Sequence, residues 1–138
     1  MLNQKSKANS LVKYLPTIVG VLLGLLFIAS GVVVLFKLVP IPPLPEGTPA
    51  AMFMGAFVPT GYLAFIKALE IAGGVLIAIP RTRNFGLLIL GPIVVNILAF
   101  HIFITKGTGL FDPPLVVVVL LTGYLLWVGR KAFLDLLN

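Results

Sequence analysis

The sequence predicts an all-α protein that folds as a four-transmembrane-helix bundle, and three observations support this prediction. Of the 138 residues, 59% are hydrophobic and only 10% are charged, and the mean hydropathy is +1.15. A water-soluble domain of this length needs a much larger charged surface. The apolar residues form four long runs, and most basic residues lie before the first run, between the second and third runs, or after the fourth. We therefore expect one integral membrane domain over residues 1–138.

The four apolar runs approach the length at which a helix crosses about 30 Å of hydrocarbon, at about 1.5 Å per residue. They cover residues 15–39, 60–79, 85–105 and 114–128. The last run is short and rich in valine, which in water would favour a strand. An isolated strand in lipid leaves its backbone polar groups without partners, so we expect a helix.

Proline and capping residues are expected to set the helix boundaries. Pro40 and the prolines that follow it should end the first span, because proline lacks an amide donor. Asn84 and Asp112 are the expected N-caps of the third and fourth spans. The apolar stretch 50–57 is too short to span, so it should lie in the outer interface or cap the bundle.

The basic residues predict the orientation in the membrane. One side carries Lys5, Lys7, Lys13, Arg81, Arg83, Arg130 and Lys131. The other side carries Lys37 and Lys106, partly balanced by Glu46 and Asp112. The positive-inside rule then places the N-terminus and the C-terminus in the cytoplasm. Because these charges are scattered at segment ends, we expect contacts with the lipid bilayer and no nucleic acid.

The absence of cysteine and the presence of a single histidine limit the chemistry. They exclude disulfides, Cys-ligated metals, iron–sulfur clusters and bis-His haem ligation within one chain. No zinc-protease, nucleophile-elbow or phosphate-loop motif is present. We expect no metal site and no evident cofactor, and no catalytic residue is predicted.

Five polar residues form the candidate site. Lys67 and Glu70 lie three residues apart inside the second run, where each charge costs about 2.5–3.5 kcal/mol. Counted along the helices, Glu70 lies level with Asn96, and Lys67 lies between Asn96 and His101. Lys37 adds a charge at the outer end of the first run. Charged side chains at bilayer depth usually face a bundle interior, so we expect one cluster in the outer half.

Each of these residues also has a structural interpretation. For Lys67 and Glu70, the alternative is a salt bridge that only stabilises the fold. For His101, which lies close to the membrane interface, the alternative is an ordinary interfacial histidine. Asn96 also suits a hydrogen bond between helices. A carboxylate near the midplane needs a proton, a cation or a ligand, which makes Glu70 the main candidate.

Several motifs, in order along the chain, resemble the DoxX-like family of small four-helix bacterial membrane proteins. The residues that carry the resemblance are GLLFIASG at 24–31 with Lys37, EIAGG at 70–74, PRTR at 80–83, and PIVVN at 92–96 with Phe100 and His101. The resemblance implies a multi-pass protein of the bacterial cytoplasmic (inner) membrane, with Glu70, Asn96 and His101 as the family's intramembrane polar positions. It also implies a link to quinone-dependent thiosulfate oxidation or membrane redox complexes, as for some relatives.

Three functions remain open from the sequence. The first is a redox-associated membrane subunit that holds a quinone-like or other small ligand, with Glu70 handling a proton and His101 or Lys67 contacting an oxygen. The second is a small-solute or proton carrier that uses Glu70. The third is an assembly subunit that binds a partner membrane or redox subunit, or a second copy of itself. The short helices without inverted repeats argue against a carrier, and whether the chain is an enzyme stays open.

Overall fold

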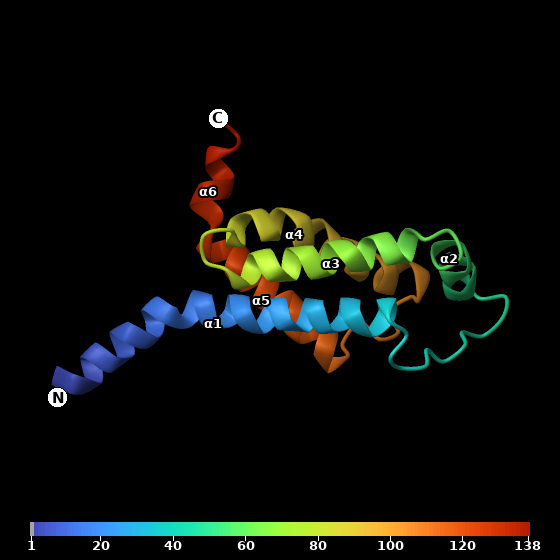
Figure 1. The fold of residues 1–138 in the computed structure, drawn as a ribbon, viewed down its shortest axis with the longest axis horizontal. Helices are drawn as coiled ribbons and strands as arrows, with labels where there is room; N and C mark the ends of the chain where they lie inside the picture. Colours follow the sequence, from blue (N-terminus) through green and yellow to red (C-terminus); the bar gives the residue numbers. More distant parts are fainter. Residues whose placement is uncertain (1) are drawn as a thin grey trace.

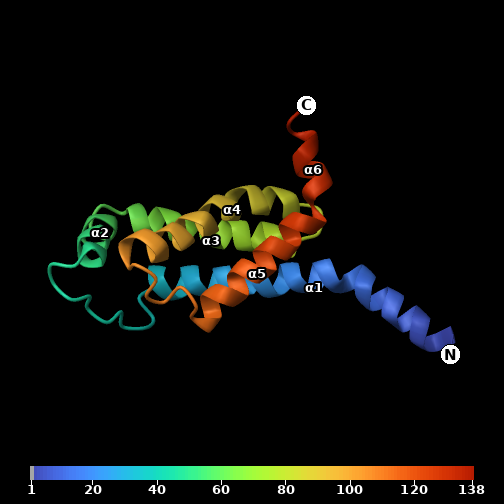
Figure 2. The same ribbon diagram turned by 180° about the vertical axis from the view of Figure 1, so that it is seen from behind.

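The computed structural model describes residues 2–138, and its regular elements in that range are all helices. They are α1 (Leu2–Leu35), α2 (Pro49–Phe57), α3 (Tyr62–Ala78), α4 (Arg83–Ala99), the π-helix η1 (Phe100–Ile104), α5 (Pro113–Val128) and α6 (Arg130–Asp135). Helices α1, α3 and α4 run alongside one another, and α5 crosses them obliquely (Figures 1 and 2). The all-α prediction is confirmed.

The two ends of this bundle carry different parts of the chain (Figure 1). Both termini lie at one end, called the terminal end below, where α6 and the first turns of α1 project from the bundle. Helix α2, the loop 36–48 and η1 lie at the opposite end, called the α2 end (Figure 2). The basic residues of segments 5–13, 81–83 and 130–131 therefore belong to the terminal end.

The number of helices that can span a membrane is smaller than the four predicted. Two helical stretches of the described chain, Asn3–Leu35 and Arg83–Ile104, are long and apolar enough. A third is obtained when α2 and α3, which are bent by 78° relative to each other, are counted as one span. Helix α3 has 17 residues and α5 has 16. At about 1.5 Å per residue, each is shorter than the hydrocarbon layer, which explains the difference.

Helix α1 begins earlier and ends earlier than expected. It starts at Leu2 rather than near residue 15, and Pro16 lies inside it. It ends at Leu35, four residues before the predicted boundary at residue 39. Lys37 adopts a left-handed φ of 52°, and the Leu38 amide donates to the Val33 carbonyl at 3.0 Å. This Schellman motif ends the helix before Pro40 is reached.

The expected N-caps are only partly found. Helix α4 begins at Arg83 with Thr82 at the N-cap position, so the prediction for Asn84 is wrong. The Thr82 hydroxyl donates to the Leu76 carbonyl at 2.8 Å, which joins the turn to the end of α3. Asp112 does precede α5, but its side chain makes no capping hydrogen bond.

Glycines bring the backbones of α1 and α3 into contact. A β-carbon on Gly24 would collide with the Gly74 carbonyl oxygen, and one on Gly74 would lie 2.7 Å from the Gly24 carbonyl oxygen. Gly20 packs against α3 in the same way, as small residues do where helices approach closely. Ala68 and Ala72 on α3 have the same four-residue spacing as Gly20 and Gly24, but both are exposed.

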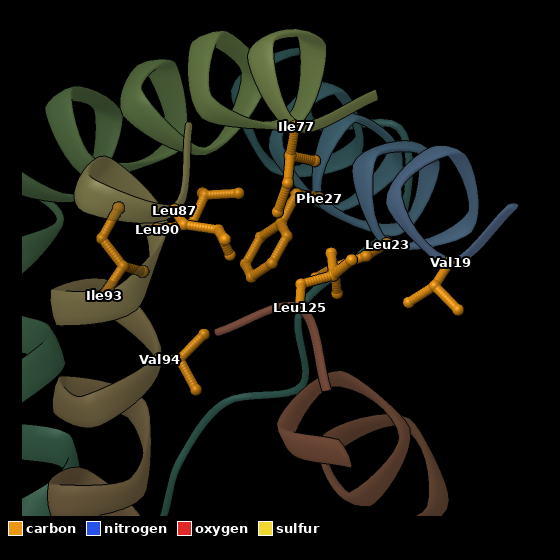
Figure 3. Packing of buried hydrophobic residues seen from close by; sticks show 9 residues of the cluster. All are labelled: Val19, Leu23, Phe27, Ile77, Leu87, Leu90, Ile93, Val94 and Leu125. Atoms are coloured by element: carbon orange, nitrogen blue, oxygen red, sulfur yellow. The ribbon is translucent and has the colours of Figure 1, made fainter. Parts of the chain in front are cut away.

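The buried apolar core occupies the half of the bundle nearest the terminal end, called the terminal half below. Its side chains come from α1, α3, α4 and α5 and point toward one another (Figure 3). Leu23, Ile77 and Leu90 are 0% exposed. This core fixes the positions of α3 and α4, and both helices continue from it toward the α2 end.

Candidate functional site

A cavity of about 460 Å³ lies at the α2 end, between α2, α3, α4 and η1. Its volume lies within the range of about 300–1,000 Å³ that is usual for small-molecule sites. The cavity places Lys67, Glu70, Asn96 and His101 around one space. Lys37 does not line it and is exposed after the end of α1. Four of the five candidate residues thus come together, and their role stays a prediction.

Lys67 and the buried Glu70 form an ion pair on one face of α3. The Lys67 Nζ lies 3.0 Å from Oε2 and 3.1 Å from Oε1 of Glu70, whose side chain is 3% exposed. The same Nζ donates to the Ser30 Oγ of α1 at 3.0 Å. An ammonium group has three donors, and these three acceptors use them. The carboxylate oxygens keep lone pairs with which Glu70 accepts further hydrogen bonds.

Close contact with α1 holds Lys67 in this position. A β-carbon on Gly31 of α1 would lie 2.9 Å from the Lys67 carbonyl oxygen. The short distance between the two backbones lets the long Lys67 side chain reach both Ser30 and Glu70. Ser30 was missed from the sequence, because no pattern along α1 marks which turn faces Lys67.

Helix α4 reaches the cavity through an irregular segment. Pro92 lies inside α4, and the Asn96 side-chain amide donates to the Pro92 carbonyl at 2.9 Å. Beyond Ala99 the helix widens into η1, where the Thr105 amide donates to the Phe100 carbonyl, five residues back, at 3.1 Å. Single π-turns of this kind occur frequently at functional sites. Here the π-turn contains His101.

His101 presents one ring nitrogen for other partners. Its Nδ1 lies 2.8 Å from the Ile97 carbonyl oxygen. Because a carbonyl only accepts, Nδ1 carries the proton in this contact, and Nε2 of the neutral ring has a lone pair. The half-buried ring packs edge-on against Phe100, with 5.4 Å between the centroids. His101 can therefore accept a proton at Nε2.

Aromatic side chains form the wall of the cavity at the α2 end. Phe57 stacks on Tyr62 with 4.6 Å between centroids, and Phe53 lies 4.3 Å from Phe57 and 5.1 Å from Phe100. The sequence predicts that residues 50–57 cap the bundle but does not identify them as a cavity wall. The feature of the sequence that indicates this wall is the spacing of Phe53 and Phe57, which lie four residues apart and therefore on one helical face.

Comparison with known proteins adds no relative: no family model, no curated protein and no solved structure matches this chain. The fold and the site thus define the class: an all-helical protein with membrane-compatible helices and a cavity of small-molecule size. The cavity combines apolar and aromatic walls with a carboxylate, an imidazole and an amide. Such a lining suits a ring compound with a few oxygen atoms.

Proposed function

We propose that this chain is a DoxX-like membrane protein that binds a quinone-like ligand in the cavity at the α2 end, as a redox-associated membrane subunit. The observation that supports this most is the cavity itself, which the buried Glu70 and His101 line together with apolar and aromatic side chains. The motif resemblance points to the same ligand class.

Two acceptors of the site, Glu70 and His101, suit the reduced, hydroxyl-bearing form of the ligand, whose hydroxyl oxygens can also accept from the Asn96 amide. Glu70 and the neutral His101 ring both accept hydrogen bonds at the cavity. The Lys67 donors already bind Glu70 and Ser30, so Lys67 positions Glu70 rather than contacting a ligand oxygen. A quinol has two hydroxyl donors for these acceptors, whereas a quinone has none.

We also propose that α1, α3, α4 and α5 all cross the cytoplasmic membrane of a bacterium, with both termini in the cytoplasm. The basic residues of the terminal end support this orientation. Interfacial side chains and local thinning of the bilayer can accommodate the short α3 and α5. A reporter fused after Asn138 should then report cytoplasm, and one inserted at Glu46 should report the outer side. A cytoplasmic signal at Glu46 would contradict both the topology and an outward-facing cavity.

Native mass spectrometry of the purified protein in detergent tests ligand binding. With a short-chain quinol added, the wild type should retain one molecule per chain. The double variant Lys67→Met/Glu70→Gln should bind it much more weakly, because a neutral amide replaces the charged carboxylate acceptor and no unpaired charge is left. The matched control Glu46→Gln makes the same carboxylate-to-amide change in an exposed loop and should bind like the wild type. Equal binding by wild type and double variant, or none by the wild type, would reject the proposed site.

An assembly subunit is the second candidate, and one observation favours it. Asn96 is exposed on the surface of this single chain although it lies in an apolar helix. An amide on a lipid-facing surface gains from a hydrogen bond to a neighbouring helix. Gel filtration and crosslinking of Asn96→Leu distinguish the candidates: loss of an oligomer or partner complex with ligand binding kept would favour assembly.

A further inference from the structure

The cavity at the α2 end has an opening on the side of the bundle. Three of its lining residues, Tyr62, Asn96 and Phe103, are exposed, and Phe103 is 75% exposed. A side chain that lines a cavity and is also exposed lies at the edge of that cavity, so these three residues mark the opening. No residue of α1 or α5 lines the cavity. The opening therefore lies between α3, which carries Tyr62, and the α4–η1 segment, which carries Asn96 and Phe103.

The carboxylate of the site lies away from this opening. Glu70 lines the cavity but is only 2% exposed, and Lys67 holds it in place. Helix α2 covers the end of the bundle beside the start of α3 (Figure 1) and contributes Phe53 and Phe57 to the wall. A ligand group that reaches Glu70 is thus surrounded by protein, and the rest of a longer ligand leaves through the opening.

The opening lies at the depth of lipid acyl chains. Asn96 and Phe103 both belong to the apolar helical stretch Arg83–Ile104, which is long enough to cross a membrane. At about 1.5 Å per residue, they lie about 20 Å and about 30 Å along the helix from Arg83 at the terminal end. In the orientation proposed above, both fall in the outer third of a hydrocarbon layer about 30 Å thick. A ligand that passes through this opening then comes from the bilayer.

The surface beside the opening is apolar. Phe65 lies next to Tyr62 on α3, with 6.4 Å between the ring centroids, and is 58% exposed. Val95, which precedes Asn96 on α4, is 64% exposed. None of the three residues that mark the opening is charged. Such a surface suits contact with an apolar chain rather than with water.

We propose that the cavity takes its ligand sideways from the lipid bilayer, through the opening between α3 and α4, and that the ligand has a long apolar tail that stays in the lipid. Within the proposed function, the ligand is then a long-chain quinol whose ring lies beside Glu70 and His101. This inference rests on the proposed function, since it names the ligand class of the same site. It also requires a free α4 surface at Asn96, because a permanent partner there would close the opening.

The side on which the cavity opens can be measured without a ligand. The chain has no cysteine, so one introduced cysteine carries a nitroxide label at a chosen position. In nanodiscs, EPR power saturation compares collisions of the label with oxygen, which concentrates in lipid, and with a water-soluble nickel chelate. A label at Phe103→Cys should collide mainly with oxygen. Glu46→Cys, in the exposed loop at the same end, should collide mainly with the chelate. Leu120→Cys, 66% exposed on α5 and outside the cavity lining, is the lipid-facing control.

Quinols of two tail lengths then test the ligand class. A saturating long-chain quinol should lower the oxygen collision rate at Phe103→Cys by about half, because a tail in contact with the label takes up the space that oxygen reaches. A short-chain quinol with the same ring should leave this rate unchanged. The label at Leu120→Cys should respond to neither compound. Native mass spectrometry of the same samples reports which quinol is retained.

The possible failures are distinguishable. Chelate collisions at Phe103→Cys equal to those at Glu46→Cys would overturn the sideways entry, because the opening would face water. Retention of the long-chain quinol without a change at Phe103→Cys, or retention of the short-chain quinol alone, would overturn this inference and leave the proposed function in place. Retention of neither quinol, with a label at Phe103→Cys that reports lipid, would reject the proposed function and leave the opening toward lipid.

Discussion

The terminal half and the α2 end of this bundle are built from the same α3 and α4 but pack differently. In the terminal half, Gly73 faces Leu90 and Gly74 faces the backbone of α1, so the helices touch. One turn further along α3 the side chain is Glu70, and from there the helices surround a cavity of about 460 Å³. The size and polarity of side chains on successive turns thus decide where the bundle is filled and where it stays open.

The ion pair at the boundary between these regions should give the largest effect on stability. Lys67→Met should lower the free energy of unfolding by about 3–5 kcal/mol, because it leaves the buried Glu70 carboxylate without its partner. The double variant Lys67→Met/Glu70→Gln should lose less, since no unpaired charge remains. Unfolding in mixed micelles measures both. A double variant less stable than Lys67→Met would contradict the pairing.

The contact between glycines in the terminal half should give the next largest effect. Gly24→Ala should cost about 1–3 kcal/mol, because the added methyl group meets the Gly74 carbonyl in a filled region. Gly123→Ala on α5 is the matched control, since nothing lies within 4 Å of its β-carbon position. Thermal unfolding in detergent should show a lower midpoint for Gly24→Ala alone. Equal midpoints would mean that α1 and α3 are not in close contact.

Substitutions in the aromatic wall of the cavity should lower stability less than those at the ion pair or at the glycine contact. Phe57→Ala should cost about 0.5–1.5 kcal/mol for the lost stack with Tyr62, beyond the apolar area exposed. Phe85→Ala, at the terminal end, removes a 60% exposed ring that forms no aromatic pair within the described chain. Phe57→Ala should also weaken quinol retention, and Phe85→Ala should not. Unchanged retention in Phe57→Ala would remove α2 from the binding site.

The exposed amide of α4 should give the smallest effect on the single chain. Asn96→Leu removes the hydrogen bond to Pro92, and hydrogen bonds within membranes contribute about 0.6 kcal/mol on average. Unfolding at low protein concentration should show a change no larger than this. A much larger loss would indicate that Asn96 binds a neighbouring helix or a second copy.

Much of the candidate site could be predicted from sequence, because it depends on distances along helices. Lys67 and Glu70 lie three residues apart, so any helix places them on one face. The expected levels placed Asn96 beside Glu70 and Lys67 between Asn96 and His101, and both Asn96 and His101 line the cavity. Lys37, which the sequence places only at the outer end of the first run, does not line the cavity, because it lies in the left-handed turn after α1.

Other features depend on how the helices are rotated against each other. Which turn of α1 faces Lys67 decides that Ser30 is its partner, and Ala68 lies outside although its spacing suits helix packing. The bend of 78° between α2 and α3 turns a predicted cap into a wall of the cavity. These are contacts between segments far apart in the chain, which local patterns do not specify.

The sequence by itself determined the helical class, the apolar stretches and the position of the polar residues along them, because these follow from composition and the rise per residue. Only the tertiary structure decided that α3 and α5 are short for a membrane span, that His101 lies in a π-turn, and that the helices surround a cavity. Those features depend on backbone hydrogen bonds and side-chain contacts that involve several helices at once. No single stretch of the chain specifies these contacts.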